Sequence, residues 1–368
     1  MIKNTSVRSF IKIINTKTIN PQIKILVTGG TGLVGSYLLR LLIEQGYQNI
    51  HATKREQSSF SLLQGKEQQV NWHDTTLNDV LGLEDAIKDS EVIIHCAAVV
   101  SFDPRDKREL IKTNVEGTAN IVNLAVEQGV RKLIHVSSIA ALGRNKTTGL
   151  TSETDKFDAD APHSLYSLTK YLAEMEVWRG KEEGLKITIV NPAIILGSGF
   201  WKVGSNGFFN HVWRQSPFYP PGATSFVDVR DVARFINMHI ESDFSVEQYL
   251  LISENRSYQW FLETIAKYLH KKAPTTKTTK LILGLAWRVD KVRSILTGSK
   301  PLLTRETAQT SLNKYQFDHT RSLLSGAFTY RALEQTIADI AAQYRIAAEN
   351  GFQPATLSFQ SKESEYAG

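Results

Sequence analysis

The sequence predicts an α/β fold, with a doubly wound parallel sheet of the Rossmann type and a smaller, mostly C-terminal domain. From Ile23 to about Pro192, short apolar runs alternate with segments whose apolar residues recur at helical spacing. A glycine-rich turn separates the first apolar run from the first helical segment. After Pro192 the alternation is replaced by stretches rich in Gly, Pro, Ser and aromatic residues. Helices that join parallel strands through right-handed crossovers cover both faces of such a sheet.

The predicted elements alternate regularly along the chain. Strands are expected at 23–29, 49–55, 91–99, 130–138 and 185–193, with a further strand ending near residue 74, and helices at 32–46, 83–90, 113–129 and 164–184. These elements form a main domain over 23–196, and the chain is expected to return to it at 225–256 and 330–347. The smaller domain is expected at 197–224 and 257–329. Residues 1–22 would form an N-terminal extension and residues 351–368 a flexible tail.

The composition excludes several classes of protein. The chain has 368 residues, of which 42% are hydrophobic, and a formal net charge of +6. No apolar stretch is long enough to span a bilayer, and the single cysteine, Cys96, excludes an intrachain disulfide and fits a cytoplasmic location. The histidines have no metal-ligand spacing, so we expect no metal, and the moderate charge suggests a phosphate-bearing small ligand rather than a nucleic acid.

The first glycine-rich turn fits two registers of a dinucleotide-binding turn. Gly30-x-Gly32-x-x-Gly35 matches the common fingerprint, and Gly29-x-x-Gly32-x-x-Gly35 matches a wider-spaced variant. In both registers, glycines let the backbone approach a pyrophosphate, and the helix that starts near Leu33 offers N–H groups and a positive dipole end to the anion. The alternative is a strand–helix turn that only requires the positive φ of glycine.

The end of the second strand suggests which dinucleotide binds. A carboxylate at this place would bind the ribose 2′-hydroxyl of NAD, but the sequence has Lys54 and Arg55. Two cations can pair with a 2′-phosphate, so we expect NADP(H), with NAD(H) as the alternative. Asp74 could accept a hydrogen bond from the adenine amino group. The alternatives are a solvated basic strand end and an exposed loop acid.

A tyrosine and a lysine lie on one face of the helix expected at 164–184. Tyr166 and Lys170 are four residues apart, and Ser137 and Ser138 precede them at the end of a predicted strand. Tyrosine can give a proton to a carbonyl oxygen during reduction, but its ordinary pKa of about 10 is high. A lysine ammonium roughly 5 Å away would lower that pKa by about two units. A serine hydroxyl would hold the substrate oxygen.

In this order, the motifs resemble those of the extended short-chain dehydrogenase/reductase family, over about residues 23–347. "TGGTGLVG" is similar to that family's cofactor turn in the wider register, "YSLTK" to its YxxxK motif and "HVSSIAALG" to its serine strand. The resemblance implies that Ser138, with Ser137 as second choice, acts with Tyr166 and Lys170, and that Asn114 supports the site. It also implies a cofactor site made by Gly29, Thr31, Gly32, Leu33, Val34, Gly35, Lys54, Arg55, Asp74, Ala97, Ala98, Lys170, Pro192 and Ile194.

Within that family the chain looks most like the dihydroflavonol-reductase and hydroxysteroid-dehydrogenase-like branch. This resemblance implies an NADP(H)-dependent oxidoreductase that interconverts a carbonyl and an alcohol on a fairly apolar small molecule. The alternatives are a nucleotide-sugar epimerase or dehydratase with bound NAD(P), and an NADP(H)-binding sensor without turnover. The smaller domain would bind the substrate, and its aromatic residues suit either an apolar pocket or a core: Phe200, Trp201, Phe208, Phe209 and Phe218.

Two further expectations concern surfaces. The segment 280–300 is amphipathic and carries five basic residues against Asp290. We expect a solvated helix that covers the substrate pocket rather than one that lies on an anionic membrane. The family resemblance also suggests a homodimer formed by the helices that carry Asn114 and Tyr166.

Overall fold

The main body of the protein is a seven-stranded parallel sheet. The computed structural model describes residues 19–145, 147–161, 163–201, 204–242, 246–301 and 303–359. The sheet has the order β11-β7-β5-β4-β1-β2-β3, and every neighbouring pair is parallel. Its strands are β1 (Ile25–Thr28), β2 (Ile50–Lys54), β3 (Asn71–Asp74), β4 (Val92–His95), β5 (Lys132–Val136), β7 (Lys186–Pro192) and β11 (Gln248–Leu251). The strand order reverses between β1 and β4, so the predicted doubly wound fold is confirmed.

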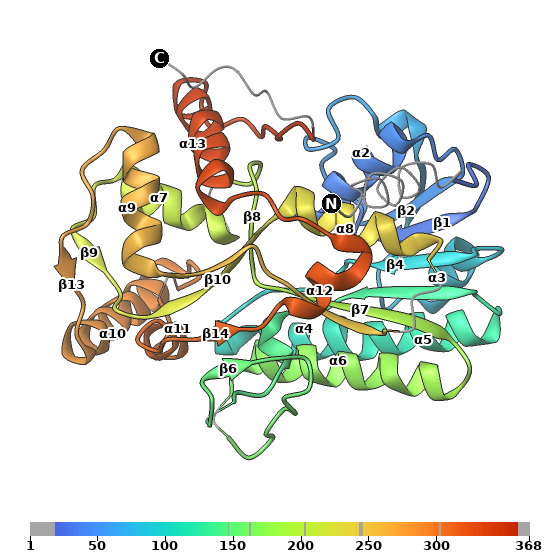
Figure 1. Ribbon diagram of the computed structural model, residues 1–368, viewed down its shortest axis with the longest axis horizontal. Helices are drawn as coiled ribbons and strands as arrows, with labels where there is room; N and C mark the ends of the chain where they lie inside the picture. The colour runs from blue at the N-terminus through green and yellow to red at the C-terminus, as the bar shows by residue number, and fades with distance from the viewer. Residues whose placement is uncertain are drawn as a thin grey trace, which may run out of the picture.

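Both faces of the sheet are buried, which explains the continuous apolar runs of its strands. In β1, Ile25 and Val27 point into one hydrophobic cluster and Leu26 into another. Helices α2 (Leu33–Gln45) and α8 (Val229–Ile240) pack together on the first face. Helices α3 (Val80–Ile87), α5 (Gly117–Glu127) and α6 (Leu165–Glu182) cover the second, where α5 and α6 run beneath the sheet in Figure 1.

The helices begin where the sequence offers polar caps. Asp79, Ser164 and Asp228 each accept a hydrogen bond from a backbone N–H in the first turn of α3, α6 and α8. Helix α2 ends at Gly46, which adopts the left-handed conformation typical of a C-terminal glycine. Ahead of α5, a short helix α4 (Lys107–Leu110) continues into a π-helical turn, η3 (Ile111–Glu116).

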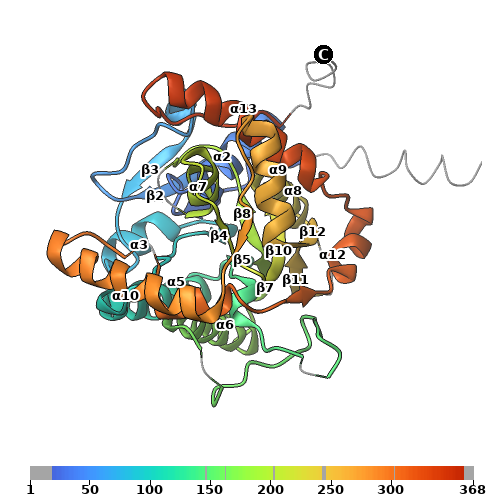
Figure 2. The ribbon, with the colours of Figure 1, turned by 90° about the vertical axis from the view of Figure 1, so that its left-hand side faces the viewer.

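The smaller lobe lies beside the sheet, on the left in Figure 1. Its strands are β8 (Ile194–Leu196), β10 (Ala223–Asp228) and β12 (Glu254–Ser257) in one mixed sheet, and the short pairs β9 (Phe218–Tyr219) with β13 (Thr276–Lys277) and β6 (Leu150–Thr151) with β14 (Gln316–Phe317). Its helices are α7 (Gly207–Trp213), α9 (Tyr258–Leu269), α10 (Lys280–Thr297) and α11 (Arg305–Thr310). The chain then continues through α12 (Thr320–Leu324) and α13 (Leu333–Glu349). Figure 2 shows α10 along the outside of this lobe.

The C-terminal half is divided differently from the sequence prediction. Of the segment 225–256, α8 and β11 do join the main sheet and its helices, but β10 and β12 belong to the mixed sheet of the smaller lobe. Helix α13, expected in the main domain, packs chiefly against α9. The local sequence pattern cannot show to which of the two sheets a strand belongs, because strands of both sheets have the same apolar character.

Residues 351–359 correct the prediction of a flexible tail from residue 351, whereas the last nine residues lie outside the described part. The amide of Leu357 donates to the Tyr37 hydroxyl, and its carbonyl accepts from both terminal nitrogens of Arg40. The Leu357 side chain joins the main core. These contacts hold the segment against α2. The sequence prediction failed because this short apolar stretch is flanked by Gly, Pro and Ser and shows no periodicity.

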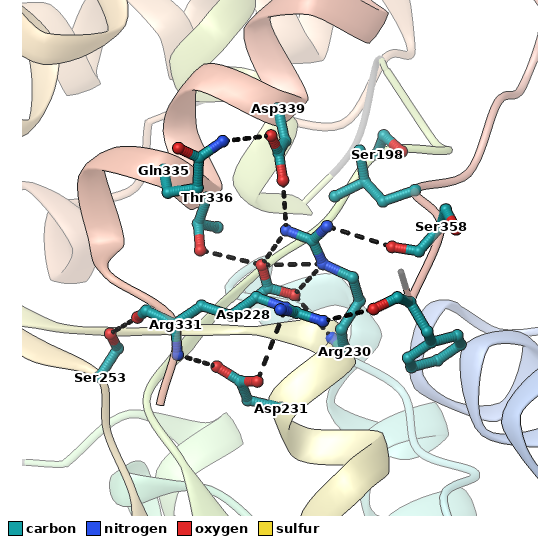
Figure 3. A network of polar contacts seen from close by, with 12 residues as sticks. Ser198, Asp228, Arg230, Asp231, Ser253, Arg331, Gln335, Thr336, Asp339 and Ser358 are labelled. Carbon is teal, nitrogen blue, oxygen red and sulfur yellow. Dashed lines mark hydrogen bonds and ion pairs between the residues drawn. The ribbon is translucent and has the colours of Figure 1, made fainter. Parts of the chain in front are cut away.

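A buried ion network joins α8 to the C-terminal part of the chain (Figure 3). Arg230 at the start of α8 pairs with Asp228 at 2.6 Å and with Asp339 of α13 at 2.8 Å. The Arg230 side chain also donates to the carbonyl of Ser358, and Arg331 donates to that of Phe359. Because Arg230 and Asp228 are almost fully buried, removing one partner would leave an uncompensated charge in the core.

The predicted N-terminal extension falls almost entirely outside the described residues, which begin at residue 19. None of the helices in the described ranges has the length and hydropathy that a bilayer-spanning segment requires. Within the same ranges, no three His, Cys, Asp or Glu side chains are arranged to hold a metal ion.

Candidate functional site

The glycine turn between β1 and α2 is shaped by two close backbone approaches. Gly29 has a φ of +69°, and a Cβ placed on it would lie 2.9 Å from the Cα of Ala97. A Cβ on Gly35 would lie 2.2 Å from the carbonyl oxygen of Gly29. A side chain at either position therefore collides with backbone. These constraints support the register Gly29–Gly32–Gly35.

Gly30, the first glycine of the other register, is required for packing instead. A Cβ there would lie 2.8 Å from the Cβ of Ala52 on β2 and 2.9 Å from the ring of Trp72 on β3. Its amide donates to the carbonyl of Thr53. This glycine therefore fixes how closely the turn lies against β2 and β3, which explains why both registers occur in one sequence.

The turn leads into a helix start that has no side-chain cap among the described residues. Gly32 is the N-cap of α2 and supplies no capping hydroxyl or carboxylate. Gly32 is exposed, and Thr31, Leu33 and Val34 are half-buried around it. A helix N-terminus left open at the carboxyl edge of a parallel sheet fits the pyrophosphate of a dinucleotide.

At the end of β2, the structure joins two residues predicted for the cofactor site. Lys54 forms an ion pair with Asp74, which ends the neighbouring strand β3. The Lys54 ammonium also lies 5.8 Å from the ring centre of Phe60. Arg55, the next residue, is exposed. A 2′-phosphate bound at this edge would lie near Arg55 and near Lys54, which is already paired with Asp74.

Tyr166 and Ser138 meet at the carboxyl edge of the sheet. Tyr166 lies in the first turn of α6, whose N-cap Ser164 accepts from the amide of Ser167. Ser138 follows β5, and its hydroxyl lies close enough to the phenol of Tyr166 to lower the pKa of that phenol. The Ser138 hydroxyl also accepts from the amide of Ala140, which holds it in place. The structure therefore brings together the predicted proton donor and the predicted hydroxyl.

Lys170 lies one turn further along α6, but its ammonium is directed to the backbone. It donates to the carbonyl of Val136 at 2.8 Å and is 2% exposed. Burial lowers the pKa of Lys170 to about 8, against a smaller opposing effect of Glu174. Burial raises the pKa of Tyr166, and the opposing effect comes from Ser138. Lys170 does not contribute to the pKa of Tyr166 in this structure, so the predicted lowering of that pKa by Lys170 is not found.

Asn114 braces the site from the π-helical turn. Its side-chain oxygen accepts from the amide of Val99 at 2.8 Å, and its amide group donates to the Val99 carbonyl and to the Thr169 hydroxyl. Asn114 therefore ties the loop after β4 to the helix that carries Tyr166. Its carbonyl accepts from the Thr118 hydroxyl, four residues further along the chain.

A buried chain of hydrogen bonds continues from Thr118 to the glycine turn. The ring of His95 at the end of β4 bonds with Thr118 at 3.0 Å and with Thr28 at 2.7 Å. The Thr28 hydroxyl accepts from the amide of Ala97. Burial and the charge of Lys170 lower the pKa of His95 to about 3, so its ring is neutral. Two of the predicted cofactor-site residues lie next to these groups. Ala97 takes part in this chain of hydrogen bonds through its amide, whereas Ala98 is exposed.

Beneath the serine strand lies a polar cluster that sequence reasoning missed. Asn191 of β7 donates to the carboxylate of Glu174 and to the carbonyl of Ser138, and Gln248 of β11 donates to both Glu174 and Asn191. Burial raises the pKa of Glu174, and the nearby Ser137 hydroxyl opposes that shift. The only signal in the sequence was Glu174 four residues after Lys170.

The next residues of β7 and β8 form the wall behind this cluster. Pro192 and Ala193 are buried at the end of β7, and Ile194 is half-buried at the start of β8. They lie where the chain passes from the main sheet to the smaller lobe, beside the carboxyl end of β5. This placement suits the predicted contact of Pro192 and Ile194 with a nicotinamide ring.

The loop after β4 carries an aromatic residue over Tyr166. The ring of Phe102 meets that of Tyr166 edge-on at 5.7 Å and is partly exposed. One ion pair and one hydrogen bond hold this loop to the C-terminal part of α10 and the turn after it: Asp106 pairs with Lys300 at 2.6 Å, and Arg105, paired with Asp103, donates to Ser294. Phe102 was not among the predicted site residues, although it follows Ala97 and Ala98 in the same loop.

Most aromatic residues proposed for an apolar pocket are core residues. Trp201 and Phe209 are buried and pack against Tyr344 of α13, and Phe208 packs against Phe261 of α9. Phe218 is exposed. The periodicity of short loop segments does not distinguish pocket from core, so this ambiguity was inherent in the sequence.

Comparison with known proteins agrees with this geometry. The model of the NAD dependent epimerase/dehydratase family matches residues 25–251. A putative dihydroflavonol 4-reductase of Synechocystis sp. is 30% identical over 85% of this chain and 92% of its own length. Sterol demethylase protein B of Methylococcus capsulatus is 31% identical over 71% of this chain and 79% of its own length.

Solved structures give the same fold. The crystal structure of gox2253 superposes with a TM-score of 0.76 at 29% identity and covers 90% of this chain and 99% of that one. A UDP-glucose 4-epimerase from Thermotoga maritima superposes with a TM-score of 0.72 over 89% of this chain and 100% of that one. At 20% identity, the second similarity supports the fold alone.

Proposed function

Because this chain belongs to the NAD dependent epimerase/dehydratase family, and so is an NAD(P)-dependent enzyme, we propose that it interconverts a carbonyl and an alcohol with NADP(H). The observation that supports the proposal is the placement of Tyr166 beside Ser138 at the carboxyl edge of β5. Ligands of doubly wound folds bind at this edge. The uncapped start of α2 and the Gly29–Gly35 approach supply a fitting cradle for the cofactor's pyrophosphate.

The chemistry follows from the positions of these groups. NADPH, when bound, supplies a hydride for the carbonyl carbon. Ser138 donates a hydrogen bond to the carbonyl oxygen, and Tyr166 gives this oxygen its phenolic proton, so that an alcohol forms. In the reverse direction, Tyr166 accepts the proton of the alcohol. Lys170, one turn further along α6, donates to the carbonyl of Val136 and so holds the end of β5, which leads to Ser138.

The preference for NADP(H) rests on the charges at the end of β2. A carboxylate that would bind the ribose of NAD is replaced there by Lys54, and Arg55 follows. Arg55 is exposed and can pair with a 2′-phosphate in a bidentate manner. Lys54 can share its charge between this phosphate and Asp74. Asp74, held by Lys54, remains our candidate partner for the adenine amino group.

A fairly apolar carbonyl compound is the substrate class we propose. The names of the relatives include a dihydroflavonol reductase, a sterol demethylase protein and, at 29% identity, a cinnamoyl-CoA reductase of Oryza sativa. Phe102 beside Tyr166 offers an apolar contact for such a molecule. The homodimer through α5 and α6 and the cytoplasmic location stay predictions.

The proposal is tested by assaying wild-type protein and Tyr166→Phe with both cofactors and a panel holding a dihydroflavonol, a ketosteroid and cinnamoyl-CoA. We expect wild-type turnover with NADPH at a kcat/KM at least about tenfold above that with NADH, as charge-assisted contacts to a 2′-phosphate imply. Tyr166→Phe should lower kcat by about 10²–10⁴-fold with unchanged NADPH affinity. Tyr171→Phe, on the same helix, is the matched control and should keep its activity. A loss below tenfold for Tyr166→Phe would refute the proton role.

A further inference from the structure

Helix α10 turns an apolar stripe toward solvent. Six large residues on one face of it are between 55% and 86% exposed: Leu281, Leu285, Val289, Val292, Ile295 and Leu296. Such spacing places side chains on one helical face. The sequence analysis expected a solvated helix. In the structure α10 is largely exposed to solvent, and its exposed side is the apolar one.

The opposite face of α10 is attached to the protein. Leu283 and Ser294 are the buried residues of the helix, and they lie on the side opposite the stripe. The helix packs against α11, and Arg105 of the loop after β4 donates to Ser294. In Figures 1 and 2, α10 lies at the periphery of the smaller lobe. The stripe therefore belongs to a fixed helix and forms an outer surface of the molecule.

Basic residues border the stripe. Lys280, Arg288 and Lys291 are exposed and lie along one edge of it, and none of them forms an ion pair with another described residue. Arg293 on the other edge is paired with Asp290. An apolar stripe with a cationic border is the pattern of helices that lie in the interface of an anionic bilayer.

We propose that α10 docks the protein on an anionic lipid surface, with the stripe in the acyl region and the basic edge at the headgroups. A second copy of this chain fits the stripe less well. A two-fold contact between two α10 helices would bring the basic edges of both copies to one interface without acidic partners. Anionic headgroups would instead neutralise Lys280, Arg288 and Lys291, and each of these residues would add binding free energy.

The docking surface is connected with the proposed site. The loop that Lys300 and Arg105 bind to α10 carries Phe102, which contacts the ring of Tyr166. A protein held at a bilayer by α10 would have this loop close to the lipid. An apolar substrate dissolved in the bilayer would then meet the protein near Phe102. The docking itself does not depend on the proposed reaction.

Co-sedimentation of the full-length chain with phosphatidylcholine vesicles, with and without phosphatidylserine, tests the inference. We expect binding that requires phosphatidylserine and weakens with salt. Lys280→Gln/Lys291→Gln should lower the partition coefficient by about tenfold or more, since each basic residue near the surface contributes about fivefold. Leu285→Glu/Leu296→Glu should lower it by about a hundredfold or more, because apolar burial is lost.

Two control variants separate α10 from general effects of charge and hydrophobicity. Lys88→Gln/Lys112→Gln removes two exposed lysines elsewhere, and Leu81→Glu/Leu324→Glu replaces two leucines that are 75% and 77% exposed outside α10. Both should bind vesicles within about threefold of wild type, apart from the uniform effect of net charge. Equal binding of the α10 variants and their controls would overturn the inference. So would a dimer of the wild type that Leu285→Glu/Leu296→Glu converts to a monomer, because a second copy would then cover the stripe.

Discussion

Individual titratable residues between the sheet and α6 are neutral or paired because they are buried. His135 on β5 lies 5.2 Å from the ring of His95, and burial holds the pKa of His135 well below its usual range. Among the described residues, neither ring nitrogen of His135 has a hydrogen-bond partner. Lys170 lies close enough to lower the pKa of both histidines. A neutral imidazole is therefore compatible with the Lys170 cation, and a protonated one is not.

His135 gives a prediction about acid stability. Below pH about 6.5 the unfolded chain binds a proton at this residue and the folded chain does not, so stability falls as pH falls, by up to about 1.4 kcal/mol per pH unit. His135→Leu removes this contribution. Between pH 7.5 and pH 5, we expect the variant to lose about 2 kcal/mol less unfolding free energy than wild type in urea titrations. The values at pH 7.5 serve as the packing control, and parallel pH curves would contradict the prediction.

Helix starts and turns are the elements that shape the site. The turn after β1 needs glycine at position 35 because the carbonyl of Gly29 occupies the place of a side chain. The π-helical turn before α5 lets Asn114 hold Val99 and Thr169 together. The first of these features has a clear signature in the sequence. The second has none, because a π-helical turn is set by a one-residue change of hydrogen-bond register, for which no residue type is diagnostic.

Gly35→Ala tests the turn. A Cβ at 2.2 Å from the Gly29 carbonyl oxygen forces the turn open, so we expect a loss of about 1–3 kcal/mol in unfolding free energy and a clear loss of NADPH affinity, by at least about tenfold. Thermal unfolding and fluorescence titration with NADPH measure the two effects. Gly207→Ala is the matched control, since no atom lies within 4 Å of its Cβ position. NADPH binding by Gly35→Ala at wild-type affinity would rule out a pyrophosphate at this turn.

At the scale of the whole molecule, the C-terminal part of the chain joins both lobes. Arg230 links the start of α8 to α13 and to the segment after it. Leu357 links that segment to α2 through Tyr37 and Arg40. The lobe that carries α9 and α13 is thereby fixed to the face of the sheet opposite α6.

Leu357→Ala measures what this C-terminal attachment contributes. The side chain is 4% exposed and belongs to the main core, so its truncation should cost about 2–4 kcal/mol of unfolding free energy. Urea unfolding at neutral pH gives the value. Leu324→Ala, at a leucine that is 77% exposed, should change the free energy by less than about 0.5 kcal/mol. Equal effects at the two positions would mean that residues 351–359 do not stabilise the fold.

Local patterns in the sequence predicted much of the fold and the place of the candidate site. Apolar runs bounded by glycine predicted the parallel strands, and the order of the Gly29 turn, Ser138 and Tyr166 along the chain located the site at one sheet edge. These features depend on near neighbours in the sequence, where 2-fold and 3.6-fold periodicity and glycine conformation act directly. The parallel topology then brings the ends of the strands together.

Only the tertiary structure decided the features that depend on distant residues. The pairing of Lys54 with Asp74, the cluster of Glu174, Asn191 and Gln248, and the attachment of Leu357 each join segments that no local pattern relates. The direction of α10 belongs to the same class. Its amphipathic sequence determined that one face would be apolar, but whether that face meets the core or the solvent depends on what the rest of the chain packs against the other face.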